Sequence, residues 1–332
     1  MQSEKQNLER RSVARVLISV SDKSAIEDFS NSLVKNGIEI VSTGGTSKIL
    51  SENGIAVTAV EDVTKFPEMM NGRVKTLHPL IFGGILARDS DKSETEQYDI
   101  GIIDMVVCNL YPFGEAVSKG VDMDALIEEI DIGGPSLLRA AAKNHARVAV
   151  VTDPLDYAWI SEEIEAGGLN LEQRRQLALK AFRHTAEYDT IIQNELSFRF
   201  DEEDLPSSLH IAGVGNPPLR YGENPHQSAI FYSDSSVQGP CVSNSTQIQG
   251  KQLSYNNLLD FDAALAIVLE FEEPTAVIVK HNNPCGAASA SNLSEAYELA
   301  VKTDPQSAFG GIVALNQEVD KDLSRSCLLY TS

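Results

Sequence analysis

The sequence predicts a two-domain α/β protein, and three observations support this fold class. In residues 14–200, short apolar runs rich in β-branched residues alternate with segments of helical periodicity, the pattern of a parallel sheet covered by helices. A polar, acidic segment at residues 201–208 then interrupts the alternation, and we place the domain boundary there. The chain has 332 residues, enough for each domain to bury its own core.

The first half of the N-terminal domain contains five predicted elements. Ser21 or Asp22 is placed to cap the first helix, and Gly37 to end it. Residues 1–13 are polar and charged, and we expect a flexible tail there. A strand, a helix, a strand, a short helix after a glycine turn, and a strand are predicted at residues 15–20, 21–37, 38–43, 44–54 and 56–63.

The second half of this domain continues the same alternation. Pro135 suits the first turn of a helix that opens after the segment DIGGP. We expect a strand at residues 102–110, a helix at residues 122–130, this second helix after DIGGP, a strand at residues 147–152 and a long helix at residues 171–198.

Residues 201–325 show a different sequence pattern, in which polar loops are prominent, and predict a second, smaller α/β domain. Polar loops run into a strand near residue 230 and a helix near residue 260. The segment PTAVIVKHNNPCGAA predicts a strand that ends in a polar loop, followed by a helix, a loop and a further strand. Residues 326–332 (SCLLYTS) offer neither a helix cap nor a turn, and we expect an atypical tail.

Composition excludes several classes of protein. The net charge of −21 argues against a nucleic-acid or anionic-membrane surface. The start has no secretory signal and no apolar run is long enough to span a membrane. Four scattered cysteines without a CxxC pair fit a reducing compartment and argue against a metal site. We therefore expect a cytoplasmic protein.

Two loops that follow neighbouring strands carry many hydrogen-bond donors. Residues 42–46 (STGGT) precede a helix, whose N-terminus favours an anion. Residues 19–23 (SVSDK) follow the first strand, and ligands of parallel sheets gather where strands end. The two loops should therefore share one edge and could bind a phosphate, although a plain strand–helix turn remains the alternative.

Two windows contain no acidic residue, although the chain has 48. Residues 71–88 include Arg73, Lys75, His78 and Arg88, and residues 132–152 include Arg139, Lys143, His145 and Arg147. An anionic ligand could replace the missing carboxylates. Ion pairs with distant acids, or solvated faces, are the alternative.

Further side chains could move protons. Tyr111 follows a strand, Asp131 precedes a Gly-Gly turn, and Lys143 ends the next helix, so together they could stabilise an oxyanion and exchange protons. In the second domain, Lys280 beside His281 would favour a neutral imidazole that acts as a base. The alternative is a histidine with only structural hydrogen bonds in a loop. We interpret Cys285 as structural, and neither a catalytic triad nor metal-ligand spacing is visible.

Eight sequence motifs, taken together, resemble those of a known family. SVSDK, STGGT, GRVKTLHP, CNLYPF, DIGGPSLLRAAAKNHARV, LRYGENPHQ, KHNNPCGAA and SAFGGIVALN occur in the order found in the bifunctional purine biosynthesis enzymes. These combine phosphoribosylaminoimidazolecarboxamide (AICAR) formyltransferase with IMP cyclohydrolase. The resemblance covers residues 13–325 and implies that residues 14–200 form a methylglyoxal-synthase-like domain, which closes the ring of formylated AICAR (FAICAR) to give IMP without a bound cofactor or metal.

The resemblance also implies roles for individual residues of the cyclohydrolase. Lys75, Tyr111 and Lys143 would stabilise the oxyanion and transfer protons, and Asp131 would orient the attacking amide. The residues implied in nucleotide binding are Ser21, Asp22, Lys23, Thr43, Gly44, Gly45, Thr46, Arg73, Val74, Thr76, Cys108, Asn109 and Ile132.

For residues 201–325 the resemblance implies the start of a cytidine-deaminase-like formyltransferase domain. This domain uses 10-formyltetrahydrofolate as co-substrate and acts on AICAR. Arg220 and Tyr221 would bind the nucleotide, His281 assisted by Lys280 would be the base, and Gly310 would approach the substrate.

The family's transferase continues beyond the point that corresponds to Arg325, and SCLLYTS does not resemble that continuation. We therefore expect an incomplete transferase domain, with ring closure as the surviving activity. A nucleotide-binding module without catalysis and a non-functional fragment are the alternatives. The family further implies a homodimer.

Overall fold

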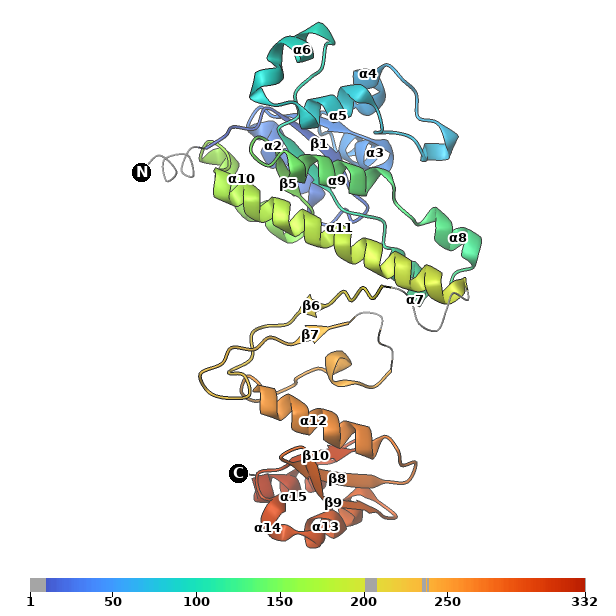
Figure 1. Ribbon diagram of the computed structural model, residues 1–332, viewed down its shortest axis with the longest axis vertical. Coiled ribbons are helices and arrows are strands. Elements are labelled where there is room, and N and C mark those ends of the chain that lie inside the picture. Colours follow the sequence, from blue (N-terminus) through green and yellow to red (C-terminus); the bar gives the residue numbers. More distant parts are fainter. Residues whose placement is uncertain (1–9, 201–207, 235–236, 238, 332) are drawn as a thin grey trace. The chain divides into compact units, whose positions relative to one another are not determined.

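The computed structural model describes residues 10–200, 208–234, 237 and 239–331. They belong to two compact units, residues 1–210 and 211–332, which Figure 1 shows. The expected linker falls outside the described residues except for Ser208, as do residues 1–9 of the expected tail. No helix in the described part of the chain is long and apolar enough to cross a membrane.

The first unit is built on a five-stranded sheet with the order β3-β2-β1-β4-β5, in which all neighbouring strands are parallel. The fold class predicted for this unit is therefore confirmed. β4 is buried at every position and β1 at its three central positions, as expected for strands covered on both faces. The strands are β1 (Arg15–Ser19), β2 (Glu39–Ser42), β3 (Thr58–Ala59), β4 (Met105–Cys108) and β5 (Ala149–Val151).

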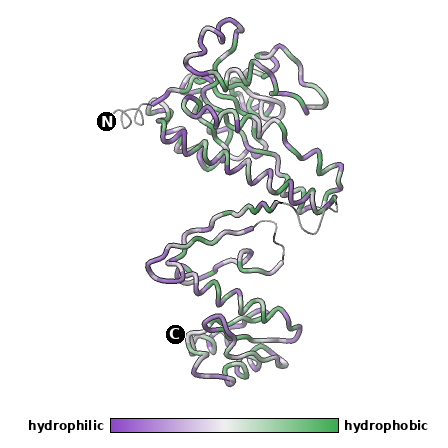
Figure 2. Tube along the Cα trace, in the orientation of Figure 1, coloured by the Kyte–Doolittle hydropathy of each residue, from purple (hydrophilic) through white to green (hydrophobic). Residues whose placement is uncertain are grey.

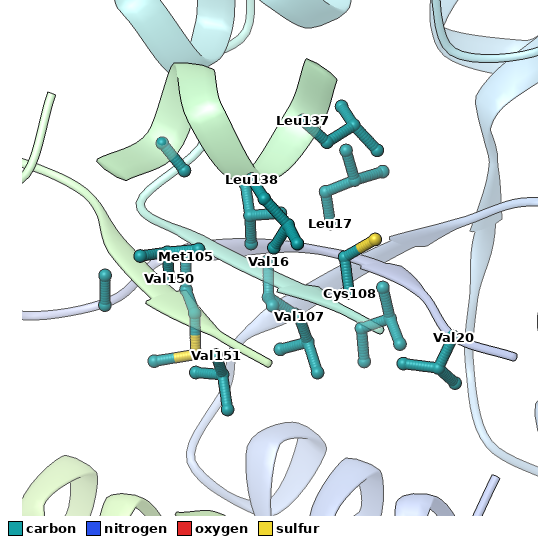
Figure 3. Packing of buried hydrophobic residues seen from close by; sticks show 14 of the residues in the cluster. Val16, Leu17, Val20, Met105, Val107, Cys108, Leu137, Leu138, Val150 and Val151 are labelled. Carbon is teal, nitrogen blue, oxygen red and sulfur yellow. The ribbon is translucent and has the colours of Figure 1, made fainter. Parts of the chain in front are cut away.

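Helices cover this sheet and provide the core. α9 (Gly133–Lys143) packs on β4 and β5, and Figure 3 shows its Leu137 and Leu138 over the strand residues. α11 (Leu171–Arg199) packs against α9 and β5. Its trace alternates between hydrophobic and hydrophilic residues in Figure 2, which matches one buried face on a long surface helix. The other helices are α2 (Ile26–Lys35), α3 (Gly44–Glu52), α4 (Val60–Thr64), α5 (Pro79–Leu86), α6 (Lys92–Gln97), α7 (Phe113–Ser118), α8 (Met123–Glu128) and α10 (Tyr157–Glu165), with 3-10 turns η1 (Met70–Gly72), η2 (Asp89–Asp91) and η3 (Pro154–Asp156).

Three local predictions for this unit are wrong. α2 begins only at Ile26 after a left-handed Ala25, so neither Ser21 nor Asp22 caps it; the Asp22 carboxylate instead accepts hydrogen bonds from the backbone and hydroxyl of Ser24. The strand expected at residues 56–63 is only two residues long and gives way to α4. Residues 10–13 are not a loose tail, because Arg11 forms an antiparallel bridge with Leu169.

The second unit contains a three-stranded antiparallel sheet with the order β10-β8-β9. The segment expected to leave β8 as a polar loop instead turns tightly at residues 281–282 and returns as β9. The expected atypical tail, residues 326–332, continues a helix as far as residue 331. The elements are β6 (Val214–Gly215), β7 (Tyr232–Ser233), η4 (Val242–Asn244), α12 (Tyr255–Val268), β8 (Thr275–Lys280), β9 (Asn283–Ser289), α13 (Leu293–Thr303), α14 (Pro305–Ala308), β10 (Ile312–Leu315) and α15 (Lys321–Thr331).

Candidate functional site

The first unit has a cavity of about 660 Å³ at the edge where β1, β2 and β4 end. This edge is where parallel sheets bind ligands, and the loops SVSDK and STGGT meet there as expected. Of the residues singled out in the sequence, the cavity is lined by Ser21, Lys23, Thr43, Gly44, Gly45, Thr46, Arg73, Val74, Lys75, Thr76, Asn109, Tyr111, Asp131 and Ile132.

One end of the cavity is formed by the N-terminus of α3. Thr43, the N-cap residue, makes no capping hydrogen bond to this helix through its side chain, so its side chain satisfies none of the first-turn N–H groups. The Thr46 hydroxyl is fixed, since it donates to the Val20 carbonyl at 3.1 Å and accepts from the Val20 N–H at 3.3 Å. N–H groups and a positive helix end therefore meet at this end of the cavity, which suits an anion.

The loop after β1 is held beside α3 by one buried amide. Asn109 Oδ1 accepts from the N–H groups of Ser21 and Asp22 at 2.6 and 2.8 Å, and Asn109 Nδ2 donates to the Asp22 carbonyl. The Lys23 ammonium donates to the carbonyls of Val20 and Ser21. Asn109 thus acts as a brace that sets the shape of the loop, and Lys23 adds a cation to the anion-binding end.

The segment around η1 brings two more cations to the cavity. Lys75 Nζ lies 3.5 Å from Glu68 Oε1, and Arg73 lies 3.2 Å from Glu128 of α8. A Cβ atom on Gly44 would lie only 3.1 Å from Lys75 Nζ. The Lys75 ammonium is therefore next to the start of α3, where an anion and Glu68 would both attract it.

Asp131 lines the cavity from the connection between α8 and α9. Its Oδ1 accepts a 2.8 Å hydrogen bond from the N–H of Gly134 in the first turn of α9. Burial raises the pKa of the Asp131 carboxyl, although hydrogen bonds from the N–H groups of Gly134, Tyr111 and Gly133 act in the opposite direction. The carboxylate is held rigidly and can accept a hydrogen bond from a ligand N–H.

The remaining lining residues near Asp131 present apolar surface and a hydroxyl. Tyr111 and Ile132 are 43% and 61% exposed, so both are accessible to a ligand. The cavity thus combines an N–H-rich, cationic end with an end suited to a flat polar ring.

Three predicted site residues of this unit are not among the lining residues. Cys108 is 1% exposed and burial raises the pKa of its thiol, so it belongs to the core beneath the cavity. Asp22 bonds to Asn109 through its backbone groups, and its carboxylate is bound by Ser24. Lys143 is exposed at the far end of α9, about 15 Å from the helix start by the helical rise, and the structure does not bring it to this cavity.

Most cations of the two acid-free windows do not face the cavity, so the expectation that an anionic ligand replaces the missing carboxylates holds for only part of these windows. Arg147, 6% exposed, donates to the carbonyls of Ala87, Gly84, Ile85 and Ile103 and pairs with Asp104. Arg88 pairs with Asp91, His78 caps α5, and Arg139 lies over the ring of Phe182. These side chains serve to stabilise the fold. Of the two windows, residues 72–77 and 132–134 line the cavity.

The predicted residues of the second unit lie in two places. His281 and Asn282 form the β8–β9 turn with φ values of 55° and 63°, a conformation that is rare without glycine. Lys280 Nζ donates to the Phe309 carbonyl at 2.8 Å, next to Gly310. The Arg220 guanidinium lies over the Tyr221 ring at 5.1 Å. This unit also has an apolar cavity of about 410 Å³. The cavity is not lined by any of the five residues predicted for the transferase site, which are Arg220, Tyr221, Lys280, His281 and Gly310.

The structure adds residues that sequence reasoning did not find. Glu68 and Glu128 pair with Lys75 and Arg73. Each acid lies a few residues before an acid-free window, and its position in the sequence does not show which cation it pairs with. Tyr188 of α11 hydrogen-bonds with the backbone at Asp131; only its place on the apolar face of the helix was visible. Among the described residues, no group of three or more His, Cys, Asp or Glu could hold a metal ion.

Comparisons with known proteins show what the chain is similar to. A model of the AICARFT/IMPCHase bienzyme family matches residues 141–328, more than half of the chain, and a model of the MGS-like (methylglyoxal-synthase-like) domain matches residues 25–136. The solved structure titled "Crystal structure of ForH" is similar at 37% identity. The match covers 54% of this chain and 95% of that one, with a TM-score of 0.50.

Proposed function

The chain belongs to the AICARFT/IMPCHase bienzyme family of purine biosynthesis, and from this premise we propose that its first unit converts FAICAR to IMP. The observation that carries the proposal is the single cavity that joins the open N-terminus of α3 to Lys75, Tyr111 and Asp131. The start of α3 suits a phosphate, Lys75 lies beside it, and Tyr111 and Asp131 add further groups that donate or accept protons.

The nucleotide phosphate is proposed to bind at the start of α3. Backbone N–H groups of residues 44–46, the hydroxyls of Thr43 and Ser21, and the Lys23 ammonium surround this end. Such a combination favours a dianion through hydrogen bonds and the helix dipole. Asn109 acts here by fixing the loop, and Cys108 by filling the core below it.

The heterocycle is then proposed to lie between the segment from Arg73 to Thr76 and the segment from Asp131 to Ile132. The carboxamide nitrogen attacks the formyl carbon, and a C–N bond forms as the C=O electron pair moves to oxygen. The oxygen takes up protons and leaves as water, while the nitrogen atoms of the new ring give up the protons that balance it. Lys75 and Tyr111 would stabilise and protonate this oxygen, and Asp131 would orient the amide N–H.

The second unit is proposed to carry residues of the formyltransferase, with 10-formyltetrahydrofolate as donor and AICAR as acceptor. The strained turn at His281 and Asn282 supports this, since such backbone conformations gather at functional sites. Lys280 and Gly310 lie together through the hydrogen bond to Phe309, while Arg220 and Tyr221 would meet the nucleotide. We propose a homodimer as the assembly.

Ultraviolet detection of IMP formed from FAICAR, with folate absent, tests the first proposal. The parent chain should turn over, and Lys75→Ala should lose at least ~100-fold in kcat, the scale of lost oxyanion stabilisation. Lys48→Ala is the matched control, because Lys48 is exposed on α3 and its ion pair within the described residues is with Glu52. A folded parent that binds IMP without turnover would support a binding module instead.

A further inference from the structure

Asp131 is held from two sides, and α9 accounts for only one of them. Its carboxylate is bound by the first N–H groups of α9. Its backbone lies in the short connection between the end of α8 at Glu128 and the start of α9 at Gly133. Neither helix supplies a partner for the Asp131 N–H, so a partner must come from elsewhere.

Tyr188 of α11 supplies that partner. Its hydroxyl accepts from the Asp131 N–H at 2.8 Å and donates to the Glu129 carbonyl at 3.0 Å. One side-chain group thus bridges two backbone groups of the connection that carries Asp131, and uses its own donor and acceptor in doing so.

The tyrosine is itself fixed. It is 7% exposed, and its ring meets that of Phe113 edge-on at 6.4 Å. Burial raises the pKa of its hydroxyl to about 12, so this group remains a protonated donor at neutral pH. A second hydrogen bond, from Arg199 of α11 to the Val121 carbonyl before α8, ties the same helix to the same region.

We propose that Tyr188 is a positioning residue for ring closure, which places Asp131 for the reacting amide through the hydroxyl bridge. This inference rests on the function proposed for the first unit. Because Tyr188 does not line the cavity, its loss should disturb Asp131 and leave phosphate binding at α3 intact.

The variant Tyr188→Phe keeps the ring and its contact with Phe113 but removes the bridge. We expect kcat for ring closure to fall by ~10- to 100-fold, the scale of a misplacement near 1 Å. KM and the inhibition constant of inorganic phosphate should change less than about threefold, since the phosphate end is untouched. Tyr157→Phe is the matched control, because Tyr157 is 4% exposed in the same core, stacks on Phe29 and lies on α10.

A double-mutant cycle shows whether the effect passes through Asp131. In an Asp131→Asn background, adding Tyr188→Phe should lower single-turnover rates by less than twofold. An undiminished effect in that background, or an unchanged kcat in Tyr188→Phe alone, would overturn the proposal. So would loss of the cooperative melt in Tyr188→Phe, because the hydroxyl would then be a requirement of the fold. An inactive parent chain would overturn the proposed function and this inference together, whereas an active parent with a fully active variant would overturn this inference alone.

Discussion

Gly134 offers a sharp test of how tightly Asp131 is held. A Cβ atom at this position would lie 2.7 Å from Leu110 Cδ2 and 3.0 Å from Asp131 Cγ, and nearer still to Asp131 Oδ2, whereas ordinary contact begins at 3.4 Å. In Gly134→Ala the carboxylate must therefore retreat by about 1 Å, a displacement that can cost on the order of 100-fold in rate. We expect kcat for ring closure to fall by that factor, with a much smaller change in KM.

The neighbouring Gly133 provides the control. A Cβ atom there would meet Thr76 Oγ1 at 3.4 Å and Asp131 Oδ1 at 3.9 Å, both ordinary contacts. Gly133→Ala should therefore keep kcat within about threefold of the parent. The assay is IMP formation under steady-state conditions, with melting temperatures of both variants measured in parallel. If Gly134→Ala were as active as Gly133→Ala, Asp131 would have no strict positional role and the reasoning would be refuted.

Three further predictions concern the fold and its charges. Arg147→Met should lower the free energy of urea unfolding by about 3–5 kcal/mol, because it removes the buried guanidinium that pairs with Asp104 and donates to several carbonyls. KM should be nearly unchanged, and a raised KM at parental stability would make Arg147 a site residue after all. The raised pKa of Asp131 means that the folded protein binds this proton more tightly than the unfolded chain does. The stabilisation from this protonated carboxyl is therefore complete below pH 3.8 and is lost as the pH rises through the folded-state pKa of Asp131. The difference in melting temperature, parent minus Asp131→Asn, should fall as the pH rises across that range. A difference that grows with pH would contradict this prediction. Ile18→Ala, at a fully buried position of β1, should lower the unfolding free energy by about 2–5 kcal/mol, and a loss below 1 kcal/mol would show that the packing relaxes around it.

The sequence was most informative where one physical pattern dominated. Buried β-branched runs such as residues 15–20 and 147–152 lie in the parallel strands β1 and β5, and Gly37, with φ of 75°, follows the end of α2. The start of α2 was misjudged because Ser24 binds the Asp22 carboxylate, which forms a local turn in place of a cap. The tight turn at residues 281–282 was hidden because neither position is a glycine.

The candidate site was predictable to the extent that it follows strand ends. The loops at residues 19–23 and 42–46 meet because parallel strands end at one edge. Charge counting was less reliable, since it treated all cations alike, whereas Arg147 is bound by backbone carbonyls and the cavity cations pair with Glu68 and Glu128. Glu128 is far from Arg73 in the sequence, and only the folded chain brings these two residues together.

A crystal structure of this chain with bound IMP would test the central claim most directly. The account predicts that the phosphate lies at residues 43–46 with Lys23 beside it, and that the purine ring lies between Lys75 and Asp131. A phosphate bound elsewhere on the chain, or a ring that does not approach Asp131, would contradict the assignment of this cavity to ring closure.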